Sequence, residues 1–399
     1  MKITLSKIFI MLFVGLSLFF FTNDFGLIDI ERTAIVTAIG IDKEQDEYTV
    51  SAEVAVPEAT DTNAENQKAL LSGSGKTVAG AIKDLGDHSG WFPKLSFCNL
   101  IIMGKGFDKE NVITVLDFFS KTTQVQSSAT VVFSENGAKE LLNATSPLDN
   151  ISSFALQKVL LKNTGFDNDV ASIDIRTFCA NYYSPHSSSY MPIIKKMSQS
   201  SDVSKGEQTG SESSSSSGQN QQTSGSGSKG KMLYDATHTA LFKNGVMVGE
   251  LNTDLTFVFN LLFKPSSEST IKINNVDGIN YILSVGKNIS KISVSASPTC
   301  INLDVSLDLY CRLINSNSTS SDDALLTNKP LNEKLCRATE GKLKSDIESL
   351  LNYQSQTTCD IFKIRDKLYR FNYKYYPLYK DCYFEKLVPS ISVNVSGQK

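Results

Sequence analysis

The sequence predicts an α+β protein in which helices cover mixed sheets, with two to three subdomains behind an N-terminal membrane segment. Strand-like and helix-like apolar patterns alternate along the chain, which indicates mixed secondary structure. Hydrophobic residues make up 41% of the chain and charged residues 20%, so the composition supports packed cores and excludes a wholly disordered chain. The length of 399 residues exceeds the usual size of one domain and predicts two or three.

Residues 1–23 have the pattern of an export signal or a membrane anchor. Lys2 and Lys7 precede an apolar run over residues 8–21 in which Ser17 is the only polar side chain. A basic start followed by an apolar stretch directs a chain for export. No small-residue cleavage site follows the run, which favours a retained anchor, although a cleaved signal also fits the pattern. We therefore expect the rest of the chain on the extracytoplasmic side of a membrane.

Two strands open the predicted N-terminal domain, residues 24–198. The run AIVTAIGID, residues 34–42, is almost continuously apolar, as in a buried strand. Apolar side chains then alternate with others from Val50 to Val56, as in a strand with two different faces. We expect the two strands to pair through a turn at residues 42–47.

Helices and strands alternate through the rest of this domain. Each assignment depends on apolar spacing near 3.6 residues for a helix, or on a short apolar run for a strand. The expected elements are a helix at Thr77–Leu85, a strand at Leu100–Met103, a helix at Val112–Phe119, a strand at Ala129–Phe133 and a helix at Gly137–Leu142.

A segment rich in Ser and Gly separates the two halves of the chain. Residues 199–231 contain one apolar side chain, Val203, among Ser, Gly, Gln and Lys. A segment that buries no apolar surface cannot offset the entropy lost on ordering, so we expect a disordered loop. Its length fits either a connection within one domain or a linker between two.

The predicted C-terminal domain, residues 232–399, begins with strands. The strings ATHTALF and GVMVGEL flank Lys243 and Asn244 as a hairpin. In a later run, residues 301–309, every second side chain is apolar, which predicts an antiparallel sheet with one buried face. The expected strands after the hairpin are Ser269–Ile273, Ile289–Val294 and Ile301–Leu309.

Two helices and a final strand complete the C-terminal domain. The helices are expected because apolar residues recur at helical spacing over Leu331–Asn352 and again after it, and such stripes usually cover a sheet. The second helix is expected to place four apolar side chains on one buried stripe: Ile361, Ile364, Leu368 and Phe371. The final strand is expected to alternate through Ile391, Val393 and Val395.

The cysteines and histidines give no metal-binding pattern. The seven cysteines include no C-x-x-C pair, and His88, His186 and His238 lie far apart in the sequence. Metal sites in proteins usually draw on ligands at short, regular spacing, so we expect no metal and no cofactor. An odd number of cysteines leaves at least one thiol free, and the sequence leaves open whether any disulfide forms.

One string resembles the end of a phosphate-binding P-loop: Gly73-Ser74-Gly75-Lys76-Thr77. The P-loop also needs a glycine five residues before its Gly-Lys pair, and Leu70 occupies that position. The preceding residues 61–67 are polar, whereas a buried strand should lead into a P-loop. We therefore expect a Gly-rich turn with Thr77 near the start of a helix, and no nucleotide site.

No pattern of catalytic residues is present. The sequence has no G-x-S-x-G motif, and none of its three histidines has a nucleophile signature near it. We therefore expect no enzyme and name no catalytic, cofactor-binding or metal-binding residue. The net charge of −3 supplies no basic field for a phosphate backbone, so nucleic acid is not an expected partner.

A cluster of tyrosines near the C-terminus has two interpretations. Tyr373, Tyr375, Tyr376 and Tyr379 lie among lysines and could stack on a ligand or meet a partner protein. Amphipathic packing against the C-terminal sheet is the interpretation that we favour.

The ordered strings of the chain resemble one family, the Ger(x)C proteins, which are C subunits of bacterial nutrient germinant receptors. The resemblance extends from about Leu27 to Gln398, apart from the Ser/Gly loop. Its carriers in the first half are DIERTAIVTAIGID, SGSGKTVAGAI and KLSFCNLIIMGKG. Later carriers are LDFFSKTTQVQSSATVVF, AKELLNATSPL, ALFKNGVMVGEL and YYPLYKDCYFEKLVPSISVNV.

The resemblance implies an extracytoplasmic α and β domain that works with two integral-membrane partners, the A and B subunits, in the spore inner membrane. It implies no chemistry. Members of the family usually carry a lipoprotein cysteine and then a tryptophan where this chain has Asp24 and Phe25, so lipid anchoring does not transfer. A histidine that the family often has is absent from the block Ser96-Phe97-Cys98-Asn99.

Two other functions compete with a membrane-associated receptor subunit needed for spore germination. The main alternative is an extracytoplasmic solute-binding protein of a transporter, which would need two similar lobes around a cleft. A cell-envelope hydrolase would need a nucleophile or a metal set that the sequence lacks. Neighbouring genes discriminate between the receptor subunit and the solute-binding protein, because a receptor subunit should lie beside genes for multi-span membrane proteins.

Overall fold

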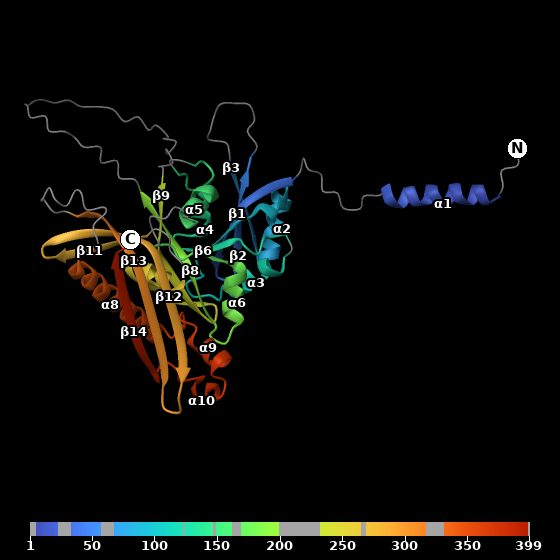
Figure 1. Cartoon of the computed structure of the whole chain (residues 1–399). Helices are drawn as coiled ribbons and strands as arrows, with labels where there is room; N and C mark the ends of the chain where they lie inside the picture. Colours follow the sequence, from blue (N-terminus) through green and yellow to red (C-terminus); the bar gives the residue numbers. More distant parts are fainter. Residues whose placement is uncertain are drawn as a thin grey trace, which may run out of the picture.

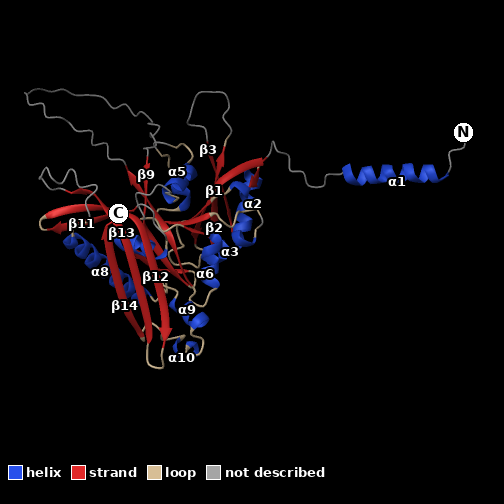
Figure 2. Ribbon diagram, in the orientation of Figure 1, coloured by secondary structure: helices blue, strands red, loops and turns tan. Residues whose placement is uncertain are grey.

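The computed structural model describes residues 5–22, 33–56, 68–122, 124–146, 149–161, 169–198, 232–264, 269–316 and 331–397. The chain is an α+β protein with two sheets and several covering helices, as the sequence predicts (Figures 1 and 2). The predicted Ser/Gly loop, residues 199–231, lies outside the described residues.

Helix α1, Leu5–Thr22, covers most of the predicted signal or anchor segment. Its described side chains from Phe9 to Leu16 are largely exposed. In the described parts of the chain, no helix meets the length and apolarity needed to cross a membrane. The anchoring role of residues 1–23 stays a prediction.

The larger sheet has ten strands among the described residues, in the order β10-β9-β8-β6-β5-β1-β2-β3, with β4 paired to β1 and β7 to β6. The central strands β1, β5, β6 and β8 run parallel and are mostly buried, which suits a sheet covered on both faces. The strands are β1 Thr33–Glu44, β2 Glu47–Ala55, β3 Lys68–Gly75, β4 Phe92–Lys94, β5 Leu100–Met103, β6 Thr130–Ser134, β7 Ile173–Asp174, β8 Ser188–Ser198, β9 Met232–Lys243 and β10 Val246–Leu251.

Helices cover both faces of the larger sheet. Helices α2 (Val78–Ser89), α3 (Ile113–Lys121) and α6 (Ile175–Tyr183) share one apolar core with it. Helices α4 (Ala138–Asn143) and α5 (Ser152–Leu160) pack on the other face. The sequence predicted α2, α3 and α4 and the strands β5 and β6, but it did not predict α5, α6 or β8.

The first two strands pair antiparallel, as predicted, but the turn between them is shorter than expected. Strand β1 continues to Glu44 and β2 starts at Glu47, so the turn is limited to Gln45 and Asp46. Gln45 has a φ of 54°, which lets the chain reverse within two residues. The expected turn at residues 42–47 was too long because charged residues at the strand ends look like turn residues.

The smaller sheet has the order β11-β12-β13-β14. Every second side chain of β13 is buried from Ile301 to Leu309, as the alternation predicted. Figure 2 shows α8 lying along this sheet and α9 and α10 at its lower end. The elements are β11 Ser269–Val276, β12 Ile279–Ala296, β13 Ile301–Ser316 and β14 Leu387–Gly397, with α7 Thr253–Phe263, α8 Glu333–Thr357, α9 Ile364–Phe371 and α10 Tyr376–Tyr379.

The prediction of an antiparallel C-terminal sheet with two helices is wrong in two respects. Strand β14 pairs parallel to β13 over Leu387–Gly397. After β13 the chain passes through α8, α9 and α10 before it returns, and a long helical connection of this kind lets it re-enter the sheet in the same direction. The described part of the C-terminal half also contains four helices, because α7 and the short α10 were not predicted.

The larger sheet crosses the predicted boundary between the two domains. The hairpin of β9 and β10 exists as predicted, but its turn is at Asn244 and Gly245, one residue later than the expected Lys243 and Asn244. Strand β9 also pairs antiparallel with β8, from Ser188 opposite Lys243 to Ser198 opposite Met232. The first two strands of the predicted C-terminal domain, residues 232–399, therefore belong to the sheet of the N-terminal domain, residues 24–198.

Candidate functional site

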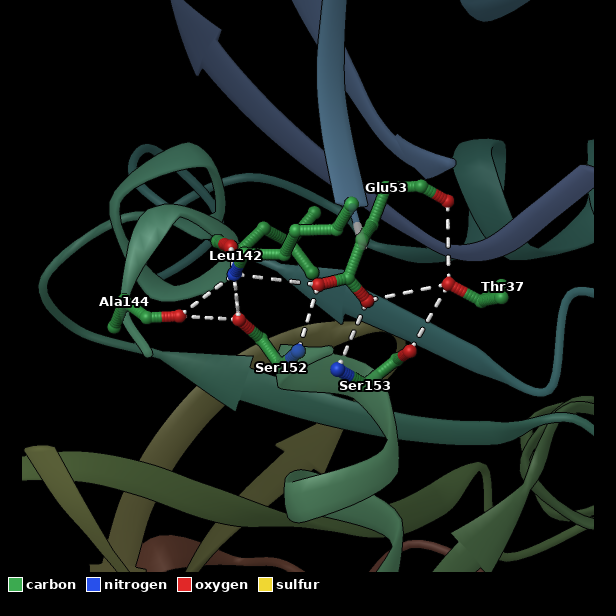
Figure 3. Close-up of polar contacts among 7 residues, drawn as sticks. Thr37, Glu53, Leu142, Ala144, Ser152 and Ser153 are labelled. Atoms are coloured by element: carbon green, nitrogen blue, oxygen red, sulfur yellow. Dashed lines mark hydrogen bonds and ion pairs between the residues drawn. The ribbon is translucent and has the colours of Figure 1, made fainter. Parts of the chain in front are cut away.

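A buried carboxylate at Glu53 of β2 holds the start of helix α5 (Figure 3). Its oxygens accept the backbone N–H groups of Ser152 and Ser153 at 2.8 and 2.9 Å, and the hydroxyl of Thr37 at 3.2 Å. The first N–H groups of a helix have no partner within the helix and carry partial positive charge. Glu53 supplies both the acceptors and the opposite charge.

Lys68 neutralises this buried carboxylate from the edge strand β3. Its Nζ lies 3.5 Å from Glu53 Oε1 and donates to the carbonyl oxygens of Leu142 and Ala144, each at 2.8 Å, and to the hydroxyl of Ser152. The ammonium group is therefore engaged on several sides by acceptors within the protein. The ion pair ties β3 to the end of α4 and the start of α5.

Asp42, the last residue of the Gly-Ile-Asp string, has the same role for helix α4. Its carboxylate accepts the backbone N–H groups of Lys105 at 2.8 Å, Ala138 at 2.9 Å and Lys139 at 3.0 Å. Gly104 leaves room for the carboxylate, since a Cβ there would lie 2.0 Å from Asp42 Oδ1. Asp42 therefore stabilises the fold by joining the end of β1 to the start of α4.

A third buried carboxylate, Asp360, starts helix α9. It accepts the backbone N–H groups of Ile364 and Arg365, each at 2.8 Å. Burial raises the pKa of Asp360 to about 6, although these two hydrogen bonds oppose the shift. The backbone N–H of Asp360 donates to the Ser188 hydroxyl of β8 at 3.0 Å, which joins this part of the C-terminal half to the larger sheet.

Residues 358–363, between α8 and α9, form a polar junction with the larger sheet, which we call the junction. Lys243 at the end of β9 donates to the Thr358 hydroxyl at 2.8 Å. Lys363 donates to the side-chain oxygen of Asn181 on α6 at 3.1 Å. The two halves of the chain therefore meet through hydrogen bonds made at both ends of this segment.

Helix α8 adds a close contact beside the junction. The Tyr353 hydroxyl accepts the backbone N–H of Glu250 on β10 at 3.0 Å. A Cβ at Gly249 would lie 2.7 Å from the same hydroxyl, so glycine is needed for this approach. The last turns of α8 thus pack directly on the hairpin that the larger sheet contributes.

Two residues of the junction and two residues next to its partners Ser188 and Lys243 have left-handed backbone conformations. The φ angles of Ser187, Asn244, Thr358 and Lys363 lie between 45° and 57°. Asn244 belongs to an Asn-Gly hairpin turn, where this conformation is usual, whereas each of the other three costs about 1–3 kcal/mol and persists only where its surroundings fix it. The N–H of Asn244 donates to the Ser187 carbonyl at 2.8 Å, which fixes one pair. This contact holds the backbone next to the junction in one conformation.

Burial keeps two titratable groups near the junction uncharged at neutral pH. Burial lowers the pKa of His186 to about 4, so its imidazole is neutral at pH 7, and it contacts the Ser184 hydroxyl. Burial raises the pKa of Cys359 to about 12, and its thiol lies 3.5 Å from the Phe242 carbonyl. A protonated buried thiol is a poor nucleophile.

The P-loop-like string forms part of strand β3 and the start of helix α2. A Cβ at Gly73 would lie 2.4 Å from Ala81 O and from Leu85 N, so this glycine lets α2 lie directly on the strand. Thr77 caps α2 by accepting the N–H of Gly80 at 3.0 Å, as predicted. The prediction of a Gly-rich turn is wrong, because the glycines serve helix packing within a strand.

The tyrosine cluster divides into buried and exposed members. Tyr379 is buried and donates its hydroxyl to the Ser297 carbonyl at 2.7 Å, and Tyr375 and Tyr376 pack partly against the C-terminal core. These three follow the packing interpretation. Tyr373 remains exposed and stacks on Tyr376 with ring centroids 6.3 Å apart.

An exposed aromatic surface, which we call the aromatic tip, lies on α9 and α10 at the lower end of the molecule in Figure 1. Phe371 was predicted to lie on a buried stripe, but it is 78% exposed. Helix α9 ends there, and the next residue, Asn372, is anchored to β12 by its amide, which donates to Val294 O at 3.0 Å. The aromatic tip comprises Tyr369, Phe371, Tyr373 and Leu378.

The three histidines do not meet in one site. His88 pairs with Asp84 on α2, His186 lies near the junction and His238 lies 3.8 Å from Glu250. Within the described ranges, no group of three or more His, Cys, Asp or Glu residues is arranged to hold a metal ion. The cysteines are free thiols.

The two sheets, the hairpin shared between the halves and the fixed junction define an α+β protein built from two linked parts. Two family models match these parts in order. The model for the spore germination protein N-terminal domain matches residues 27–196, and the model described as spore germination B3/GerAC like, C-terminal, matches residues 237–398. The chain belongs to this family of spore germination proteins, which confirms the resemblance to Ger(x)C proteins.

A solved structure has the same fold. The crystal structure of the GerBC protein matches with a TM-score of 0.52 at 14% sequence identity, and the match covers 93% of this chain and 100% of that chain. At this identity the likeness concerns the fold alone. A comparison with curated proteins finds no match.

Proposed function

We propose that the chain is a non-enzymatic, membrane-associated subunit of a spore nutrient germinant receptor and is needed for germination. The observation that carries this proposal is the succession of two spore germination domains over residues 27–196 and 237–398. They account for most of the chain. The subunit acts by binding its partners through its folded parts.

The buried ionisable groups support a role without turnover. Glu53, Asp42 and Asp360 are occupied by the N-terminal N–H groups of three helices. Burial leaves His186 and Cys359 uncharged at neutral pH. These groups stabilise the fold, and they are buried, whereas a general acid, a general base or a nucleophile has to reach its substrate.

The partners in this proposal are two integral-membrane subunits, A and B, on the extracytoplasmic side of the spore inner membrane. The family and the export-like pattern of residues 1–23 support this location. The aromatic tip is the candidate partner surface, because exposed aromatic residues are enriched at the centres of protein interfaces. The Asn372 side chain donates to the Val294 carbonyl and accepts the Ala296 N–H of β12, which attaches this surface to the smaller sheet.

Spores that lack the gene test the proposal. They should fail to respond to at least one nutrient and should germinate normally when the receptors are bypassed. A gene copy with Phe371→Ser and Tyr373→Ser should restore the protein level but not the full response. The matched control is Tyr310→Ser, which removes a partly exposed aromatic ring from β13 and should restore the response.

Normal responses of the deletion spores to every nutrient, without a redundant receptor, would show that the chain is not a receptor subunit. Full activity of the double variant would leave the receptor role intact and exclude the aromatic tip as the partner surface.

A further inference from the structure

An exposed apolar surface lies beside the start of strand β1, and we call it the edge patch. It comprises Ile35, Trp91, Phe92 and Phe97, whose exposed fractions are 39%, 47%, 41% and 54%. Single exposed apolar residues are ordinary on protein surfaces, whereas a contiguous group marks a place where something binds.

Strand pairing brings the members of the edge patch together. Strand β4 runs parallel to the first residues of β1, with Phe92 opposite Thr33 and Lys94 opposite Ile35. Alternation places Ala34 and Pro93 in the core and turns Ile35, Phe92 and Lys94 to the opposite, exposed side.

The two remaining members flank strand β4. Trp91 immediately precedes β4, and Phe97 ends the 3₁₀ turn Leu95–Phe97 that packs along β1. The exposed rings of Trp91, Phe92 and Phe97 therefore lie within seven residues of chain, in segments that pair with or pack beside β1.

The edge patch is close in the chain to the apolar helix α1. Helix α1 ends at Thr22 and β1 begins at Thr33. The residues between them, 23–32, span at most about 35 Å when fully extended. Any membrane that receives α1 is thus within reach of the start of β1, which Figure 1 shows at the periphery of the body, beside α2.

The charges around the edge patch suit a lipid headgroup region. Lys94 is exposed on the same side as Phe92, and a lysine can extend its ammonium group to phosphate while its stem covers apolar surface. Of the two acidic residues of the nearby helix α2, Asp87 pairs with Lys83, and Asp84 accepts the backbone N–H of Ser74 at 2.9 Å and lies 3.1 Å from the His88 ring.

We propose that the edge patch rests in the headgroup region of the membrane that holds α1. Tryptophan and other aromatic residues favour the membrane–water interface, where an apolar ring and a polar edge are both satisfied. This orientation places the start of β1 toward the lipid and α10, at the opposite end of the body in Figure 1, away from it. The aromatic tip would then meet parts of the A and B subunits that extend out of the membrane. The inference rests on the membrane association proposed above.

Trp91 is the single tryptophan of the chain, so its fluorescence reports directly on the edge patch. The experiment uses the full chain in vesicles of phosphatidylcholine and phosphatidylglycerol, with and without brominated acyl chains near the headgroups. Bromolipid should quench Trp91 emission, and quenching by aqueous iodide should be about threefold or more weaker than for a tryptophan in water.

Two relocated tryptophans provide matched controls in a Trp91→Phe background. Phe97→Trp keeps the reporter in the edge patch and should give strong bromolipid quenching and weak iodide quenching. Phe371→Trp moves the reporter to the aromatic tip and should give the opposite result. Both positions already carry an exposed aromatic ring, so the fold should tolerate the changes.

Flotation of the vesicles separates the two proposals. If the chain floats with the vesicles but iodide quenches Trp91 as strongly as a tryptophan at position 371, the edge patch does not contact lipid and the inference is overturned. If the chain does not float, membrane association itself is wrong and the inference fails with it. The receptor role is judged independently by the spore responses.

Discussion

At the scale of single residues, three carboxylates far from one another share one role. Each accepts backbone N–H groups at the start of a helix. For Glu53 and Asp42 this helix lies almost 100 residues later in the chain, and for Asp360 it begins four residues later. For Glu53 and Asp42, an acidic residue within an otherwise buried strand is the sequence signal that could have identified them. Its partner could not be read from the sequence, because Ser152 lies 99 residues after Glu53.

Two buried groups at the junction should respond to pH in opposite directions. Burial raises the pKa of Asp360 from 3.8 to about 6, so the folded state binds its proton more readily than the unfolded state and this group favours stability as the pH falls from 6 to 4. Burial lowers the pKa of His186 from 6.5 to about 4, so this group costs stability as the pH falls over nearly the same range.

We expect the two contributions to offset each other in the wild-type protein between pH 6.5 and 4. Asp360→Asn should leave the histidine effect alone, and the free energy of unfolding should then fall as the pH is lowered. His186→Gln should give the opposite slope. Denaturant unfolding across this pH range measures all three proteins, and parallel slopes would contradict the assignment of these groups.

At the scale of elements, the sequence predicted the strands and helices whose apolar residues recur with a clear period within the element itself. Strand β13 was predictable because apolar side chains alternate along it. Strand β8 has the mixed sequence SSYMPIIKKMS, and its place between β6 and β9 depends on partners distant in the chain. Helix α5 is short, and Glu53 supplies the acceptors for its first N–H groups.

A glycine pair tests the close packing of α2 on β3. Gly73→Ala should lower the free energy of unfolding by about 3 kcal/mol, because its Cβ would meet the backbone of α2 at 2.4 Å. The matched control is Gly341→Ala on α8, where nothing lies within 4 Å of the added Cβ. That change should stabilise the protein by about 1 kcal/mol through helix propensity.

Denaturant unfolding of the two alanine variants provides the measurement. Equal stability of Gly73→Ala and the wild-type protein would mean that α2 does not lie on β3 as described. It would favour the interpretation of residues 73–77 as a loop.

No change in ATP binding is expected for Lys76→Ala, since Lys76 is exposed beside a strand and a helix start.

At the scale of the whole molecule, the two family domains share one sheet. The domain organisation predicted from the sequence placed residues 24–198 and 232–399 in separate domains. The pairing of β8 with β9, and the packing of Ala240 and Phe242 into the core of the larger sheet, join them. This could not be predicted, because periodicity identifies a strand but not its neighbour in the sheet.

A cut between the two halves tests this arrangement. With a protease site introduced between residues 210 and 211, we expect the two pieces to elute together under native conditions and to separate only in denaturant. The expectation rests on the β8–β9 pairing and on the junction contacts of Lys363 and Asp360. Separation of the pieces in native buffer would show that each half folds and stands alone.

The shared sheet also sets an order of events during synthesis. The chain leaves the ribosome N-terminus first, so strand β8 emerges before the strand that will cover its edge. Until β9 follows, this edge offers unpaired backbone groups that can join strands of other chains. The larger sheet is therefore complete only after Leu251 has emerged, and a chain that stops after the first domain carries an open edge.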